Sequence, residues 1–234
     1  MSQALIDFGS GPLFRLCFAI MVLGLIRAFV LSAYGMVEAL GRAGDRKVKW
    51  APLFKQTVAW LVPAGRFWRM RPIYSTVSII WHVGIILVPL FFSAHILLWK
   101  SGAGISWPAL PEAAADALTL VAIAAGVLLF LGRVFDRRSR ALSRFQDYAW
   151  PLLITAAFVT GYLCVNTTLS AGGYRMAMLL HVASADLIMV LIPFTKVAHC
   201  VLMPLSQMVS HVGWRFPAGA GDKVAAMVRK EKAA

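Results

Sequence analysis

The sequence predicts an all-α integral membrane protein with five transmembrane helices in a bundle. Hydrophobic residues make up 60% of the 234 residues, charged residues only 14%, and the mean hydropathy is +0.74. Several apolar segments reach the length of about 20 residues that a helix needs to cross a bilayer. A net charge of +13 would suggest nucleic acid in a soluble protein, but these basic residues lie between apolar segments. We therefore expect membrane lipid around the bundle and no nucleic-acid partner.

The chain divides into five predicted spans and their connections. In order, the spans cover residues 13–34, 73–99, 118–131, 149–165 and 174–205. Residues 1–210 then form one membrane domain and residues 211–234 a basic tail, and we expect a largely extended chain after residue 205. Within the loop over residues 35–72, a Trp-rich amphipathic stretch is interrupted by Pro52 and Pro63, so it should lie along the interface rather than cross the membrane. A docking surface for a soluble partner is the other use that this stretch allows.

The distribution of basic residues predicts the orientation. Of the 23 Lys and Arg residues, eight lie in the loop between the first two spans, five between the third and fourth spans, and five in the tail. By the positive-inside rule, that side is the cytoplasm. The predicted protein is a multi-pass protein of the bacterial inner membrane, with its N-terminus outside and its C-terminus in the cytoplasm.

Four histidines lie inside two of the predicted spans. His82 and His95 are on the second span, and His181 and His199 are on the fifth. His181 and His199 are 18 residues apart, which is five turns of a continuous helix, so both rings should leave it on one side. Because the two spans are antiparallel, His82 should lie at the depth of His199, and His95 at the depth of His181.

Paired imidazoles at two depths favour haem over zinc. A low-spin haem takes two axial imidazoles, whereas structural zinc takes four converging ligands. The cysteines Cys17, Cys164 and Cys200 form no CxxCH motif, so two non-covalently bound b haems are expected. The 13 residues between His82 and His95 would turn their rings about 140° apart on a straight helix. Supercoiling and a bend at Pro89 are expected to absorb that difference.

Other ionisable residues inside the spans have two interpretations each. Arg27 and Lys196 either extend to the nearer membrane surface or contact a haem propionate or a quinone. Arg175 lies where a propionate of the outer haem would be reachable. Asp186 either accepts a proton from a quinol or forms an ion pair with Arg27 or Arg175, and we favour the ion pair.

The chain resembles a known family over nearly its whole length. The resemblance is visible in two segments, which are HVGIILVPLFFSAH on the second span and HVASADLIMVLIPFTKVAHCVLMP on the fifth. They resemble the gamma subunit of respiratory nitrate reductase and, more closely, the di-haem cytochrome b subunits of the transmembrane redox complexes of sulfate-reducing bacteria. The resemblance implies that all four histidines are haem ligands. It also implies electron exchange with a menaquinone pool, a cytoplasmic iron-sulfur subunit and a periplasmic multihaem cytochrome c.

The sequence contains no nucleotide fingerprint, cluster motif or hydrolytic constellation, so we expect an electron-transfer subunit rather than a complete enzyme. Two alternatives remain open. One is a haem-free membrane anchor or small transporter in which the histidines move protons or metal ions. The other keeps a single haem at only one of the two histidine pairs.

Overall fold

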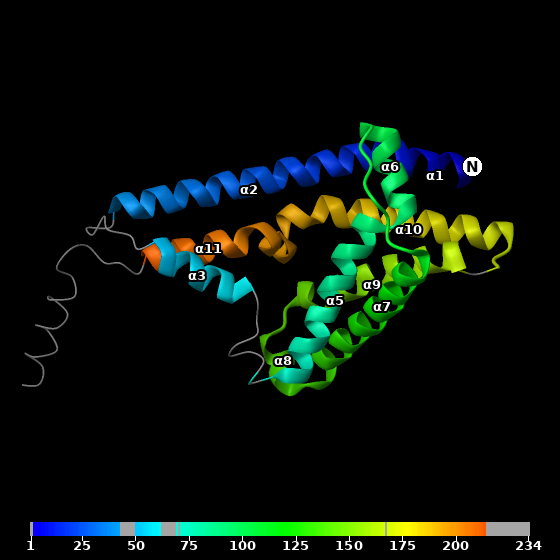
Figure 1. The fold of residues 1–234 in the computed structure, drawn as a ribbon. Coiled ribbons are helices and arrows are strands. Elements are labelled where there is room, and N and C mark those ends of the chain that lie inside the picture. The colour runs from blue at the N-terminus through cyan, green and yellow to red at the C-terminus, as the bar shows by residue number, and fades with distance from the viewer. Residues whose placement is uncertain (1, 43–49, 62–68, 70, 167, 214–234) are drawn as a thin grey trace, which may run out of the picture. The chain divides into compact units, whose positions relative to one another are not determined.

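The computed structural model describes residues 2–42, 50–61, 69, 71–166 and 168–213. Its described residues form helices and short connections (Figure 1). The elements are α1 (Ser2–Phe8), η1 (Gly9–Leu13), α2 (Phe14–Arg42), α3 (Trp50–Leu61), α5 (Pro72–Phe91), α6 (Ser93–Ala103), α7 (Glu112–Phe135), α8 (Arg137–Leu142), α9 (Phe145–Asn166), α10 (Ala171–Leu191), η2 (Ile192–Phe194), η3 (Lys196–Ala198) and α11 (His199–Gly213).

Five helical segments are long and apolar enough to cross a membrane. They cover Gln3–Glu38, Pro72–Phe91, Glu112–Phe135, Phe145–Asn166 and Ala171–Phe194. This confirms an all-helical, multi-pass membrane protein with five candidate spans. The sides on which the termini lie and the identity of the membrane stay predictions. The first span starts earlier than expected because α1, η1 and α2 follow one another without a break.

The chain forms two compact units. The first contains residues 1–22 and 66–196, and the second contains residues 23–65 and 197–234. Within the second unit, α3 packs against α11. The stretch over 50–61 is helical, and its position along the membrane interface stays a prediction. The other parts of the predicted loop at 43–49 and 62–68 and of the tail at 214–234 lie outside the described residues.

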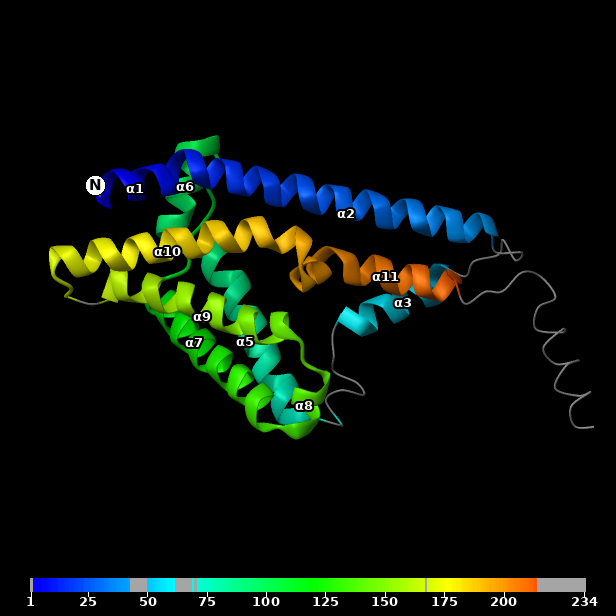
Figure 2. The same cartoon turned by 180° about the vertical axis from the view of Figure 1, so that it is seen from behind.

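Small residues hold the core of the first unit together. Helix α7 packs between α5 and α9, and α10 packs on α9 (Figures 1 and 2). A Cβ atom on Gly84 of α5 would lie 2.6 Å from the Cβ of Ala122 on α7. A Cβ atom on Gly126 of α7 would clash with the hydroxyl of Thr155 on α9. Such close backbone approach is how membrane helices gain packing energy where the lipid is as apolar as the side chains.

The predicted second span is broken. Helix α5 ends at Phe91, Phe92 is extended, and the chain turns into α6, so the prediction of one continuous span over 73–99 was wrong. Pro89, three residues before Phe92, is the local feature that the prediction treated only as a bend. The break places His82 on α5 and His95 on α6, so their angular offset on one helix no longer applies.

The carbonyl groups at the broken end of α5 accept hydrogen bonds from residues that follow the helix. The last four carbonyls of a helix have no partner within it and need one elsewhere. In α5 they accept hydrogen bonds from the Phe92 N–H (Val88 O, 2.9 Å), the His95 ring (Pro89 O, 3.2 Å), the Trp107 indole (Leu90 O, 2.8 Å) and the Leu110 N–H (Phe91 O, 2.9 Å). The connection after α6 therefore returns to the end of α5 and fixes where α6 begins.

The predicted fifth span is also broken. Helix α10 ends at Leu191, and Thr195 is extended at φ −128° and ψ −179°, so the prediction of one continuous helix over 174–205 was wrong. Pro193 lacks the N–H that would continue the helix. The Thr195 hydroxyl donates to the carbonyl of Leu191 at 2.8 Å, which satisfies one of the carbonyls that the break releases. Beyond the break, α11 continues to Gly213, where an extended chain was expected after residue 205.

Candidate functional site

The structure brings together His95 of α6 and His181 of α10. Their ring centres are 6.0 Å apart and their planes differ by only 4°. Both side chains are half-buried, and the Phe92 ring packs edge-on against His95 with centroids 5.4 Å apart. The two histidines expected to meet at one depth are therefore neighbours, and we call them the outer pair.

Hydrogen bonds fix the orientation of both rings. The Nδ1 atom of His181 lies 2.8 Å from the carbonyl oxygen of Ala157, and that of His95 lies 3.2 Å from the carbonyl of Pro89. Because a carbonyl oxygen can only accept a hydrogen bond, each Nδ1 must carry the proton. In a neutral ring the lone pair is then on Nε2. This is the arrangement that metal-ligating histidines use, in which the second nitrogen is tied to a fixed acceptor.

Gly161 of α9 makes room for His181. A Cβ atom at this position would lie 2.8 Å from Cε1 and 3.0 Å from Nδ1 of the His181 ring. Real Cβ contacts are essentially never as close as the first of these distances. The glycine thus lets the ring lie directly on α9, where Nδ1 reaches the carbonyl one turn earlier at Ala157. This role of Gly161 could not be predicted from the sequence, because only the packing of α10 on α9 reveals it.

The rings of the outer pair are stacked, and their separation is close to that of two axial haem ligands. A metal–imidazole bond is about 2 Å long and the nitrogen lies just over an ångström from the ring centre, so two axial imidazoles on one iron have centres about 6 Å apart. The observed separation of 6.0 Å matches this value. Among the described residues there is no group of three or more His, Cys, Asp or Glu side chains that could hold a metal ion.

The inner pair, His82 and His199, is divided between the two compact units. His82 resembles the outer pair in one respect, since its Nδ1 atom lies 2.6 Å from the carbonyl oxygen of Ser78. The Trp81 ring packs edge-on beside it with centroids 5.5 Å apart. His199 is exposed and is the first residue of α11. The pairing of these two residues stays a prediction.

The predicted propionate or quinone contacts have different surroundings. Lys196 forms an ion pair with Asp147 at 2.6 Å, and its main-chain N–H donates to the Gln146 side chain at 3.1 Å. These contacts tie the chain after the α10 break to the start of α9. Arg27 and Arg175 are exposed residues of α2 and α10. None of the three roles is tested by these positions, and each stays a prediction.

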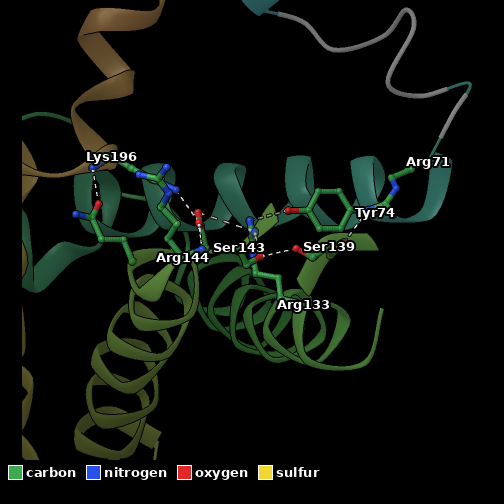
Figure 3. Close-up of polar contacts among 9 residues, drawn as sticks. Arg71, Tyr74, Arg133, Ser139, Ser143, Arg144 and Lys196 are labelled. Atoms are coloured by element: carbon green, nitrogen blue, oxygen red, sulfur yellow. Dashed lines mark hydrogen bonds and ion pairs between the residues drawn. The ribbon is translucent and has the colours of Figure 1, made fainter. Parts of the chain in front are cut away.

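A polar network that the sequence did not predict joins the ends of α5, α7, α8 and α9 (Figure 3). Arg133 donates to the Tyr74 hydroxyl at 2.8 Å and lies 4.0 Å from the carboxylate of Asp147. Arg71 bonds both Asp136 and the Ser139 hydroxyl at 2.7 Å.

Within this network, the hydrogen bond from Ser139, with further ones from Arg71 and two backbone N–H groups, lowers the pKa of Asp136 to about 2. Asp136 also caps α8, because its carboxylate accepts from the N–H groups of Arg138 and Ser139. The network therefore fixes one end of the first unit and involves neither outer-pair histidine.

Asp186 is buried on α10, with 5% of its surface exposed. Its Oδ2 atom has no hydrogen-bond partner. The expected ion pair with Arg175 was wrong, because the two residues are eleven positions apart on one helix, roughly 16 Å along its axis. Arg27 belongs to the second compact unit.

Comparison with known proteins places the chain beside a relative from a sulfate reducer. A curated protein of Nitratidesulfovibrio vulgaris strain Hildenborough, named only "Protein", is 35% identical over 154 residues. The match covers 65% of this chain and 67% of the relative, so the chain belongs to the same family as that protein. No family model matches the chain, and no solved structure matches it.

Proposed function

We propose that this protein is a di-haem b-type cytochrome, the membrane subunit of a quinone-linked respiratory oxidoreductase. The observation that carries the proposal is the outer pair, in which parallel imidazoles lie 6.0 Å apart and each Nδ1 faces a carbonyl. Haem iron supplies one-electron chemistry when it is bound. The chain's part is to hold the ring orientations fixed.

We assign the inner site to His82 and His199. The support is that the Nδ1 atom of His82 faces the carbonyl of Ser78, as the two outer rings face carbonyls of their own. Two sites at different depths would carry electrons across the membrane between a menaquinone pool and soluble redox partners. On this proposal Lys196, Arg27 and Arg175 contact propionates or quinone.

The proposed partners follow from the resemblance of the two histidine segments. They are an iron-sulfur subunit on the cytoplasmic side and a multihaem cytochrome c on the periplasmic side, with the chain in the bacterial inner membrane. The relative from a sulfate-reducing bacterium supports this assignment to that branch of cytochrome b subunits. The resemblance also makes this chain an electron-transfer subunit, whose partners supply the terminal chemistry.

The test is the haem content of the protein purified gently from membranes. We expect a b-type pyridine haemochrome and about two haems per chain. Replacement of any one of the four paired histidines by alanine should remove about one haem. His211→Ala is the matched control, because it removes a histidine that belongs to neither pair, and its haem content should stay at the wild-type value.

The alternatives predict different results. A haem-free anchor or transporter would contain almost no haem and would show no spectral change in any histidine variant, which would overturn the proposal. A single-haem protein would contain about one haem and would lose it only in the two variants of one pair.

A further inference from the structure

Asp186 stands out among the acidic residues of the chain. Of the acidic side chains in the described residues, it is the one that is buried, with 5% exposure, and its Oδ2 atom has no hydrogen-bond partner. An ionised carboxylate in such a position loses its hydration without gaining a counter-ion. The group must therefore be neutral unless a positive charge lies near it.

The main chain of η1 covers this carboxyl group. A Cβ atom on Gly9 would lie 2.6 Å from Cγ1 of Val182 and 3.8 Å from Oδ2 of Asp186. The glycine permits the close approach, and a π-helical turn of this kind often marks a functional site.

The charged groups on the elements around Asp186 are few. The thiol of Cys17 on α2 interacts electrostatically with the Asp186 carboxyl group. On the same N-terminal segment, Asp7 and Arg15 are exposed. Helix α9 has no charged residue after Asp147 at its start, and neither η1 nor η2 has any. On α10 itself, Arg175 is exposed, and His181 is the nearest group that could bring a positive charge.

His181 lies five residues before Asp186 on α10, a rise of about 7.5 Å. Five residues also turn about 140° around the helix axis, so the two side chains leave α10 on different faces. A charge held at the outer pair would then act on the carboxyl group from on the order of 15 Å, and a haem held there would carry one more positive charge when oxidised than when reduced. At an effective dielectric constant near 20, one unit of charge at that distance changes a proton affinity roughly sixfold.

We propose that Asp186 is a proton-binding site coupled to the electron held at the outer pair, an inference that rests on the proposed function. When a reductant such as a hydroquinone delivers one electron to the outer site, Asp186 takes one proton from the aqueous phase and forms a carboxyl O–H bond. The local charge then stays constant. When the electron leaves, the O–H bond breaks and the proton is released.

Redox titration of the full-length protein, followed by haem absorbance between pH 6 and 9, tests this inference. In the wild type, the midpoint potential of the outer haem should fall with rising pH by up to about 50 mV in total, the one-electron equivalent of a roughly sixfold affinity change. In Asp186→Asn the potential should be independent of pH. Asp7→Asn removes an exposed acid from the N-terminal segment and should behave as the wild type.

A second measurement needs no variant. The infrared difference spectrum between reduced and oxidised wild-type protein should contain a carbonyl band of a protonated carboxylic acid, which appears on reduction. Two bound haems with a pH-independent potential and no such band would overturn this inference and leave the proposed function intact. A protein without haem would overturn both.

Discussion

Gly161→Ala should displace His181 and release the outer haem. The added Cβ atom would lie 2.8 Å from Cε1 and 3.0 Å from Nδ1 of the ring, so the ring must move away from α9. That movement breaks its 2.8 Å hydrogen bond to the carbonyl of Ala157. Loss of such an orienting partner typically lowers metal affinity about 10- to 100-fold. The overpacking itself costs roughly 1–3 kcal/mol of stability.

The assay is the haem-to-protein ratio after purification, together with the absorbance of the reduced protein. We expect the ratio to fall from about two toward one in Gly161→Ala. Gly132→Ala is the control, because nothing lies within 4 Å of a Cβ atom at that position on α7. A Gly161→Ala protein with two haems and an unchanged spectrum would refute the role assigned to the glycine and to the His181 orientation.

Three further perturbations test the supporting structure. Asp136→Asn should lower the melting temperature at pH 7 and have little effect near pH 2. The pKa of Asp136 is lowered to about 2 in the folded protein, so its stabilising effect is present above its unfolded pKa near 4 and is lost as the pH falls toward 2. An equal fall in melting temperature at both pH values would contradict this. Gly84→Leu should prevent α5 from packing on Ala122 and yield little folded protein. A yield of folded protein equal to that of the wild type would contradict this packing. Trp107→Phe removes the 2.8 Å hydrogen bond to the Leu90 carbonyl and should cost about 1 kcal/mol and weaken retention of the outer haem, measured by thermal unfolding and haem content. Unchanged values in both assays would show that this bond does not fix α6.

The sequence predicted the helical class and the number of candidate spans, because uninterrupted apolar segments of membrane length have few other folds. It also predicted that His95 and His181 would meet, since antiparallel spans bring equal depths together. It failed at the breaks. Pro89 and Pro193 were visible, but which residue after each proline leaves the helix depends on donors from elsewhere, such as Trp107 for the end of α5.

Close contacts between helices were beyond the sequence for a similar reason. A glycine in an apolar helix has the same appearance whether it faces lipid or a neighbouring helix. Gly132 has no neighbour within 4 Å, whereas Gly161 lies against the His181 ring. The polar network around Arg133 was missed because its partners Tyr74 and Asp147 come from different helices. These contacts depend on how the helices pack against one another, and the hydrophobic pattern of a single helix carries no information about that packing.

The pairing of the histidines is tested most directly by two double variants. His95→Ala combined with His181→Ala removes both ligands of one site, so the protein should keep about one haem, as each single variant does. His82→Ala combined with His95→Ala removes one ligand from each site and should leave almost none. Equal haem contents in the two double variants would contradict the account of two haems clasped by these pairs.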